Sequence, residues 1–446
     1  MGTSRRKVTK MNKHLIVISI DAMVFEDIEI AKNMPNFKRL LDGAAVIRRV
    51  RTIYPSVTHP VHATILTGAP AGITGVGNNL VFKPEAPDKC KEWYSELHQI
   101  KCDTLLHAAK RAGLTTASSN WPLVARSGSV VDYLVPGALN YHFEGRENDP
   151  LEVYRELGAD EDMMEIIKEG VKLYGYRDVH PAVDNFQIFC ASKIIKKYKP
   201  NLLLIHPGDV DHVRHQSGVF SDEVTDSLRR CDGWLGQLFD AIDEAGIADT
   251  TDVIVLSDHG QINITRVVSP NVWIVDKGYI QLASDGSIKH WDAYIMSTGA
   301  SAQVYLSRPN DEKLKNDVLK LLTDMANEGI YGFERVYTDE EARNKYGLYG
   351  DFSFVLETDG YTSFGSRLTR PAVTGYDFDD YRYCKGTHGH EPHKGPQPTF
   401  IAKGPSFKAG AVIENGNVLN HAPTIAKVLG LELRDAVGSS VNEILN

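Results

Sequence analysis

The sequence predicts an α/β fold with a mostly parallel central sheet flanked by helices. Three short aliphatic runs, without polar alternation, have the pattern of strands that are covered on both faces. Helical periodicity fills much of the chain between these runs. The strand-like runs are Leu15–Ile20, Asn201–Ile205 and Asp252–Leu256, and the helical segments are Met34–Leu41, Thr104–Ala112, Asp184–Tyr198 and Asp222–Glu244.

Acidic or histidine side chains follow each of the three strand-like runs. Asp21 follows the first, Asp209 and Asp211 follow the second, and Asp258 with His259 follows the third. In open α/β sheets, ligands bind at the carboxyl ends of the strands. We therefore expect the three strand ends to form one shared site.

The chain of 446 residues is longer than a typical single domain. Its pattern changes between residues 265 and 380 and returns to the earlier one near residue 399. We predict a core of residues 13–264 and 381–446, a small α+β cap inserted at 265–380, and a leader or tag-like tail at 1–12. The supporting elements are strands at Ser301–Leu306, Asp351–Glu357 and Thr399–Ala402, and helices at Asp311–Glu328 and His421–Gly430.

Composition and charge argue against several classes of protein. The net charge of -9 disfavours a nucleic-acid scaffold, which needs clustered Lys and Arg. No stretch approaches the roughly 18 apolar residues of a membrane span. The apolar run 14–20 is too short for a signal peptide, so we expect a cytoplasmic protein. Widely spaced cysteines, odd in number and without a CxxC pair, favour free thiols: Cys90, Cys102, Cys190, Cys231 and Cys384.

Thr58 is the first residue for which the sequence suggests a chemical role. Pro60 suits the first turn of a helix that begins just after Thr58, and the N–H groups at such a helix start favour an anion such as phosphate. A threonine hydroxyl needs a base or a metal to become a nucleophile. Without such a partner, Thr58 would be an ordinary N-cap.

Three further segments carry side chains suited to metal binding. The first has a carboxylate and an imidazole four residues apart, which meet on one face of a helical turn, and both groups suit zinc. The second follows an aliphatic strand, and the third is a glycine-containing loop with three histidines. The segments are Asp211-His-Val-Arg-His215, Asp258-His259-Gly260 and Gly386-Thr-His388-Gly-His390-Glu-Pro-His393.

Each segment is weak evidence alone, but their order along the chain is specific. The series D, T-x-P-x-H-x-x-x-x-T-G, D-x-x-x-H, D-H-G and G-x-H-G resembles the alkaline phosphatase superfamily, and within it the type I phosphodiesterase / nucleotide pyrophosphatase branch. The resemblance covers about residues 13–260 and 386–430. It implies an alkaline phosphatase-like core with two Zn²⁺ ions, for which Mn²⁺ is a substitute.

The resemblance also implies roles for single residues. Thr58 is expected to be the nucleophile, and Asn79 to hold a phosphoryl oxygen, with Asn78 as the fallback if the register slips by one. His62 matches a motif histidine without a defined role. The implied ligands are Asp21, Thr58, Asp258 and His259 for one zinc, and Asp211, His215 and His388 for the other.

Two regions depart from the pattern of the branch. His390 and His393 compete with His388 for the last ligand position, and we rank His388 first because it carries the G-x-H-G spacing. His212 and Arg214 stand where the branch usually has small residues. Arg214 either faces a second phosphate or carboxylate of the substrate or lies in solvent, and we favour solvent.

The resemblance implies a hydrolase of phosphodiesters or nucleotide pyrophosphates with a phospho-threonine intermediate. Two metals ~4 Å apart suit this chemistry because they stabilise the attacking and the leaving oxygens. Alternatives in the superfamily are a phosphonoacetate-type C–P hydrolase and a phosphomonoesterase. A remote alternative is a non-catalytic metal-bound binding protein.

The expected partner is a small-molecule phosphate ester or phosphonate, with no membrane and with the oligomeric state open. We expect the walls of its pocket at Trp121 and Pro122, near Tyr174 to Tyr176, and in the segment 265–380. Aromatic side chains there would be able to stack on a base.

Overall fold

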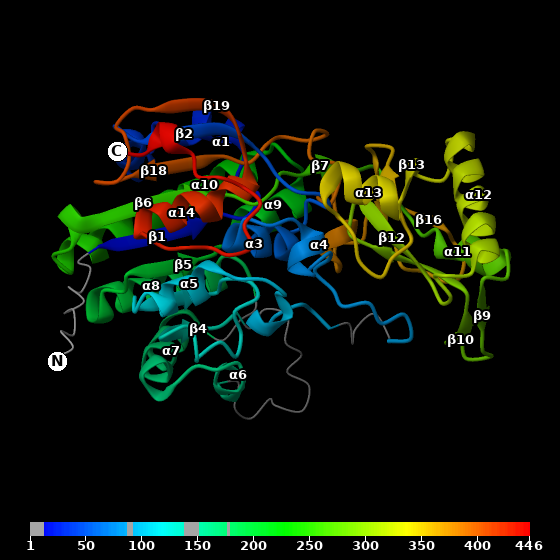
Figure 1. Cartoon of the computed structure of the whole chain (residues 1–446), viewed down its shortest axis with the longest axis horizontal. Coiled ribbons are helices and arrows are strands. Elements are labelled where there is room, and N and C mark those ends of the chain that lie inside the picture. Colours follow the sequence, from blue (N-terminus) through cyan, green and yellow to red (C-terminus); the bar gives the residue numbers. More distant parts are fainter. Residues whose placement is uncertain (1–12, 87–91, 138–150, 176–178) are drawn as a thin grey trace, which may run out of the picture.

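The computed structural model describes residues 13–86, 92–137, 151–175 and 179–446. Its largest element is an eight-stranded sheet in the order β19-β2-β18-β6-β1-β5-β3-β4. The predicted fold class is confirmed, because the sheet is mostly parallel and is flanked by helices (Figure 1). The strands are β1 (His14–Ser19), β2 (Ala45–Arg51), β3 (Thr116–Ser119), β4 (Tyr133–Val135), β5 (Leu202–Ile205), β6 (Thr251–Leu256), β18 (Phe400–Lys403) and β19 (Val412–Asn417).

The three strand-like runs of the sequence are neighbours at the middle of this sheet. Strand β1 pairs in parallel with β5 on one side and with β6 on the other. Strand β18 runs antiparallel to both of its neighbours, β6 and β2. The parallel trio therefore brings its carboxyl ends to one edge of the sheet, as the sequence predicts.

Helices cover the sheet on both faces because successive side chains of a strand point to opposite sides. Leu15 and Val17 of β1 pack into one apolar cluster, and Ile16 and Ile18 pack into the other. The first cluster includes residues of α3 (Thr58–Thr67), α5 (Leu105–Arg111) and α14 (His421–Leu429). The second includes residues of α1 (Phe25–Ala31), α2 (Pro35–Leu41), α7 (Glu161–Tyr174), α8 (Ala182–Tyr198) and α10 (Asp222–Glu244).

The segment 265–380 builds a separate antiparallel sheet in the order β11-β12-β14-β13. This sheet lies at the opposite end of the molecule from β1 (Figure 1), and its strands are β11 (Ala293–Ser297), β12 (Ser301–Leu306), β13 (Phe333–Thr338) and β14 (Phe354–Thr358). The remaining elements of the segment 265–380 are β8 (Arg266–Val268), α11 (Asn271–Asp276), β9 (Ile280–Leu282), β10 (Ile288–Trp291), α12 (Glu312–Glu328), α13 (Asp339–Tyr346), β15 (Thr362–Phe364) and β16 (Val373–Thr374).

Short elements join these two parts near the strand ends. Helix α9 (Asp209–Ser217) follows β5, and the short strands β7 (Ile262–Asn263) and β17 (Gly386–Thr387) pair in antiparallel fashion beside it. Two further short helices are α4 (Ala71–Thr74) and α6 (Glu152–Glu156). The β7–β17 pair holds the histidine loop against α9, which positions the candidate site.

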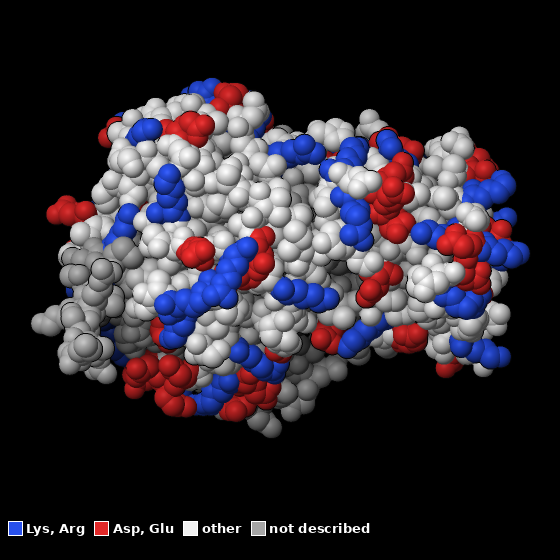
Figure 2. All heavy atoms as spheres, viewed as in Figure 1, with Lys and Arg blue, Asp and Glu red and all other residues white. Residues whose placement is uncertain are grey.

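The predictions about membrane spans, charge and cysteines can be compared with the described residues. No helix in these ranges is long and apolar enough to cross a bilayer. Acidic and basic side chains are intermixed on the face shown in Figure 2. The four cysteines within the described ranges are free, and Cys90 lies outside them. The cytoplasmic location stays a prediction.

Candidate active site

The candidate site lies at the carboxyl ends of the three central strands. Asp21 follows β1, Asp258 and His259 follow β6, and α9 carries Asp211 after β5. Thr58 is the first residue of α3, so it starts that helix rather than preceding it. The structure thus gathers residues that are far apart in the sequence.

The first metal-ligand cluster consists of Asp21, Asp258 and His259, whose ligand atoms all lie within 4.8 Å of one another. His259 Nε2 is 3.5 Å from Asp21 Oδ1 and 3.3 Å from Asp258 Oδ2. The same nitrogen is 3.2 Å from Thr58 Oγ1. All four residues that the sequence assigns to one zinc therefore surround one point.

The second cluster consists of Asp211, His215 and His388, again within 4.8 Å. His215 Nε2 is 3.2 Å from Asp211 Oδ2, because the two residues are one helical turn apart on α9. His215 Nδ1 donates to the Gly386 carbonyl at 2.7 Å, which leaves Nε2 for a ligand. The rings of His388 and His259 stack at 4.1 Å, so the two clusters adjoin.

Among the three histidines of the loop, only His388 joins a cluster within the described residues. His390 Nδ1 donates instead to the Glu391 carbonyl at 2.9 Å, and the His393 side chain is 69% exposed. His388 Nε2 lies 4.0 Å from Asp211 Oδ1. The geometry therefore favours the residue that the sequence ranks first.

The donor sets fit divalent cations. Within the described residues, five buried atoms of the clusters have no hydrogen-bond partner: Asp21 Oδ1, Asp258 Oδ2, His215 Nε2, His259 Nδ1 and His388 Nδ1. An unpaired buried carboxylate is costly unless a proton or a cation neutralises it. Burial raises the pKa of Asp21 well above its usual value, and the nearby carboxylates of Asp211 and Asp258 raise it further.

The pKa values of His388 and His215 shift in opposite directions. Burial and the neighbouring His259 hold the pKa of His388 well below its usual value. Burial also acts to lower the pKa of His215, but Asp211 outweighs it and the net shift is upward. A neutral His388 suits metal ligation, since a ligand nitrogen must be deprotonated.

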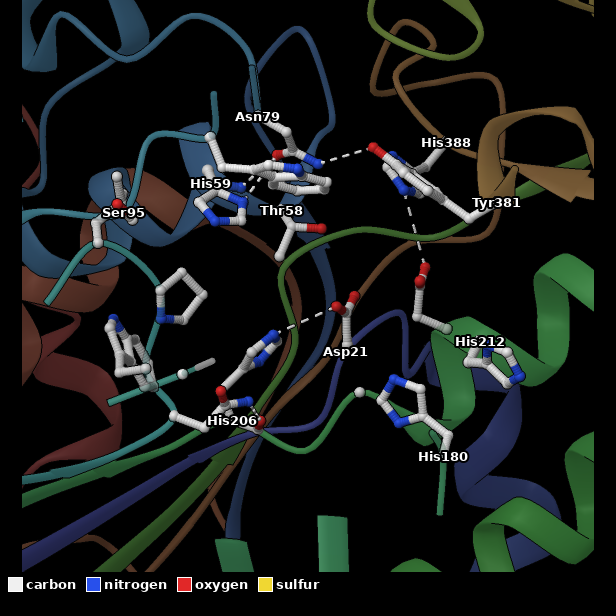
Figure 3. A pocket seen from close by; sticks show the side chains of 18 of the residues that line it. Asp21, Thr58, His59, Asn79, Ser95, His180, His206, His212, Tyr381 and His388 are labelled. Carbon is white, nitrogen blue, oxygen red and sulfur yellow. Dashed lines mark hydrogen bonds and ion pairs between the residues drawn. The ribbon is translucent and has the colours of Figure 1, made fainter. Parts of the chain in front are cut away.

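Asn79 is held so that its amide nitrogen faces the pocket. Its Oδ1 accepts from the backbone N–H of His59 at 2.9 Å, and its Nδ2 lies 3.4 Å from the Tyr381 hydroxyl (Figure 3). Asn78 donates instead to the Ser297 carbonyl at 3.2 Å. Only Asn79 of this pair lines the pocket, which supports the register that places it there.

A model of the type I phosphodiesterase / nucleotide pyrophosphatase family matches residues 15–391. The chain belongs to this family. Rat ectonucleotide pyrophosphatase/phosphodiesterase family member 1 is 22% identical over 227 residues, which is 51% of this chain but only 21% of that protein. Rat family member 7 is 20% identical over 440 residues, 95% of this chain and 85% of that protein.

Solved structures of other family members share the fold. Human ectonucleotide pyrophosphatase/phosphodiesterase 5 has a TM-score of 0.67 at 19% identity, over 97% of this chain and all of that chain. An inactive variant of the murine protein, in complex with AMP, has a TM-score of 0.66 at 17% identity, with the same coverage of both chains. At these identities the likeness shows the fold.

This family member has a pocket of about 240 Å³ over the two clusters. One of its walls is aromatic and apolar, with Trp93, Trp121, Pro122 and Leu123, so the expected role of Trp121 and Pro122 as lining is confirmed. The expected contribution of 265–380 is wrong, since no described residue of that segment lines it. Tyr381 lies just beyond that segment and lines the pocket instead.

The other expected wall position, near Tyr174 to Tyr176, is wrong for Tyr174 and stays a prediction for Tyr176. Tyr174 is described and does not line the pocket, and Tyr176 lies outside the described residues. The chain there turns away because Tyr174 ends α7 and packs on Phe189 of α8, behind the sheet. An aromatic pair in a sequence does not reveal which side of the sheet it covers.

A further expectation is wrong, because the Arg214 side chain faces neither solvent nor the pocket. Its side chain is fully buried, and its Nη2 is 2.6 Å from Asp27 Oδ1 on α1. Arg214 directly precedes His215 on α9, so its side chain leaves the helix about 100° away from that ligand. Arg214 therefore fastens α9 to α1.

Several residues of the site escaped the sequence reasoning. His206 Nε2 lies 3.4 Å from Asp21 Oδ2, while its Nδ1 is 3.1 Å from the Ser19 carbonyl. Because His206 directly follows β5, its position at a strand end could have identified it from the sequence. His62, which the sequence matched to a motif without a defined role, is buried, with Nδ1 bonded to the Thr58 carbonyl at 2.7 Å and Nε2 to Ser19 at 3.0 Å, so it braces the first turn of α3.

A third group, His180, Asp184 and Asp209, also has ligand atoms within 4.8 Å of one another. Its acidic members already have partners. The Arg230 guanidinium is 2.6 Å from Asp209 Oδ2, and the Gly208 N–H donates to Asp184 Oδ1 at 2.7 Å. The neighbouring guanidinium makes this group a poor cation site.

Proposed function

We propose that this protein is a metal-dependent hydrolase of phosphodiesters or nucleotide pyrophosphates, with a two-zinc site and a phospho-threonine intermediate. One observation carries the proposal. Thr58 Oγ1 lies 3.2 Å from His259 Nε2, within a cluster of ligands and at the first turn of α3. A nucleophile, ligand groups and an anion-favouring helix start therefore coincide.

The chain's own residues perform three tasks in this proposal. Thr58 Oγ1 forms a bond to phosphorus while the bond from phosphorus to the leaving oxygen breaks, and water then cleaves the bond between phosphorus and Oγ1. Asn79 donates to a phosphoryl oxygen, because His59 fixes its orientation. The buried carboxylates of Asp21 and Asp258 supply negative charge for a cation.

Zinc suits the donor sets because each combines carboxylate oxygen with imidazole nitrogen. Bound divalent ions would lower the pKa of the Thr58 hydroxyl and stabilise charge on the leaving oxygen. Mn²⁺ is a substitute for the same oxygen and nitrogen ligands. His215 is held ready for this role by the Gly386 carbonyl, which fixes its tautomer.

The size of the pocket and its aromatic wall support a small substrate with an aromatic or nucleotide part. The AMP that the murine relative binds has this chemistry. A C–P hydrolase of the phosphonoacetate type and a phosphomonoesterase are the alternatives, since the same nucleophile and clusters would serve both.

A parallel assay tests the proposal. Protein loaded with zinc is given bis(4-nitrophenyl) phosphate, a nucleotide pyrophosphate, 4-nitrophenyl phosphate and phosphonoacetate, and kcat/KM is measured for each. We expect the highest kcat/KM for the diester or the pyrophosphate. A clear preference for phosphonoacetate or the monoester would replace the proposal with one of its alternatives. Inactivity on all four substrates, with both metals bound, would refute it.

A further inference from the structure

The third group described above presents two imidazoles to the active-site pocket. His180 and His212 both line the pocket, and their rings stack with centroids 5.0 Å apart at 29°. Figure 3 shows the pair together on one side of the pocket, away from Ser95 and beyond Asp21. His212 directly follows Asp211 on α9 and lies about one helical turn before His215, so it adjoins the second cluster.

His180 is held in a fixed orientation by a buried carboxylate. Its Nδ1 donates to Asp184 Oδ2 at 2.6 Å, and Asp184 is fully buried at the start of α8. The second oxygen of Asp184 accepts from the Gly208 N–H at 2.7 Å. With Nδ1 engaged in this way, Nε2 is the nitrogen left to a ligand.

Gly208 allows His180 to lie against the strand end. A Cβ atom at position 208 would meet His180 Cε1 at 2.9 Å, closer than real side chains approach. The ring therefore packs on bare backbone at the pocket floor. Within the described residues, the His212 ring has no hydrogen-bond partner, so its nitrogens are also available.

The charge on His180 suits an anion. Burial acts to lower the pKa of His180, but Asp184 outweighs it and shifts the pKa upward, so the positively charged form is favoured. Arg230 neutralises the adjacent Asp209 at 2.6 Å. The carboxylates of Asp184 and Asp209 are thus partnered by the protein itself, and Asp211, beside His212, belongs to the second cluster. Burial and the neighbouring His180 lower the pKa of His212, so His180 carries the positive charge and His212 adds a neutral ring to the pocket lining.

We propose that His180 and His212 bind a second anionic group of the substrate, a carboxylate or a phosphate carried on the same molecule as the scissile phosphoryl group. The proposal deepens the proposed function by naming a substrate class, and it rests on that function for the position of the phosphoryl group. It also explains the departure at position 212, where the sequence has an imidazole beside a ligand. From the sequence, Arg214 was a candidate for binding a second phosphate or carboxylate, but its side chain is buried against Asp27.

Binding to a protein that cannot turn over tests the pair independently of activity. The Thr58→Ala protein, loaded with zinc, is titrated by calorimetry with phosphonoacetate, with its amide isostere carbamoylmethylphosphonate, and with methylenebisphosphonate. Hydrogen bonds to a charged group are stronger than those to a neutral group. We therefore expect phosphonoacetate or the bisphosphonate to bind about tenfold tighter than the amide. The tighter of these two identifies the second group as carboxylate or phosphate.

The decisive comparison adds His180→Gln or His212→Gln to the Thr58→Ala background. Either substitution should bring the ratio between the anionic probe and the amide close to one. His290→Gln is the matched control, since its side chain is 51% exposed in β10, and it should leave the ratio unchanged. Metal content is measured for every variant, so that a lost metal is not mistaken for a lost anion site.

Two results would overturn the proposal: no preference for either anion in the Thr58→Ala protein, or a preference that survives both histidine substitutions. Failure of the proposed function would look different. In that case the wild-type protein would hydrolyse none of the phosphate esters, whereas the preference for an anionic probe and its loss in the histidine variants would still be measured.

Discussion

The two metal-ligand clusters adjoin each other, yet they are built from different parts of the fold. The three members of the first cluster, Asp21, Asp258 and His259, all come from the ends of β1 and β6, two paired strands of the large sheet. It is also braced internally, because the Ala22 N–H donates to Asp258 Oδ1 at 3.1 Å. The central sheet alone therefore positions these groups.

The second cluster joins a helix to a loop that the segment 265–380 supports. The His388 carbonyl accepts from the Ala300 N–H at 2.8 Å, and the Gly389 carbonyl accepts from Ser301 Oγ at 2.6 Å. Gly389 has φ +99, and a Cβ atom there would lie 2.1 Å from the Thr298 carbonyl oxygen. The inserted segment thus contributes no pocket lining among the described residues but holds a ligand loop in place.

Glu391 adds a second connection between that loop and the inserted segment. Its carboxylate accepts from the hydroxyls of Tyr337 and Tyr346 and from Lys345 Nζ at 3.0 Å. The first cluster therefore depends on the central sheet, and the second depends on contacts between the His388 loop and the segment 265–380. Perturbations of the inserted segment should therefore affect the two clusters unequally.

The largest expected effect comes from Thr58, the proposed nucleophile, which contacts His259 of the first cluster. Thr58→Ala should lower kcat by about 10⁴-fold or more, by the scale of other nucleophile deletions, while both metals stay bound. Turnover of a diester and metal content by emission spectroscopy measure the two quantities. Retained turnover would remove Thr58 from the mechanism, and loss of metal would make it mainly a ligand.

The next effect concerns α9, which carries two ligands of the second cluster. Arg214→Met leaves Asp27 as a buried, unpaired carboxylate, which should cost about 3–5 kcal/mol of unfolding free energy. Urea unfolding of the metal-free protein measures this. Adding Asp27→Asn removes the buried charge and should recover much of the loss. A cost below about 1 kcal/mol for Arg214→Met would contradict the buried pair.

Glu391→Gln should distinguish the clusters most sharply. The substitution weakens the contacts that hold the His388 loop, so the metal of the second cluster should lose about 10–100-fold in affinity, as metals do when supporting residues of their sites are changed. The other metal should be unaffected. Competition with a chromophoric chelator measures both constants, and the exposed Glu340→Gln on α13 is the matched control. Equal weakening of both metals would show that the clusters are not separately supported.

The smallest effect is a change in the acid sensitivity of the metal-free protein. Burial acts to raise the pKa of Glu391, but the donors Tyr337, Tyr346 and Lys345 outweigh it and lower the pKa to about 2. A carboxylate with a lowered pKa stabilises the fold above its unfolded pKa, about 4.3, and this stability is lost as the pH falls toward 2. The Tm of Glu391→Gln should therefore fall less between pH 5 and pH 3 than that of wild type. An identical decline would show that Glu391 is not held ionised.

Much of the fold and of the first cluster could be predicted from the sequence because the signals are local. A covered strand is an aliphatic run, and its end is a fixed place for a ligand, which gave Asp21, Asp258 and His259. Helical spacing gave Asp211 with His215 in the same way. The antiparallel direction of β18 was not predictable, since a covered strand has the same pattern in either direction.

The parallel trio of strands, the order of the motifs and the family they indicate follow from the amino-acid sequence, because each depends on residues within one helical turn or one strand end. The choice among His388, His390 and His393, the burial of Arg214 on Asp27, and the position of His180 beside His212 in the pocket follow from the three-dimensional fold. Those outcomes depend on which distant surfaces pack together, and one-dimensional periodicity carries no information about such contacts.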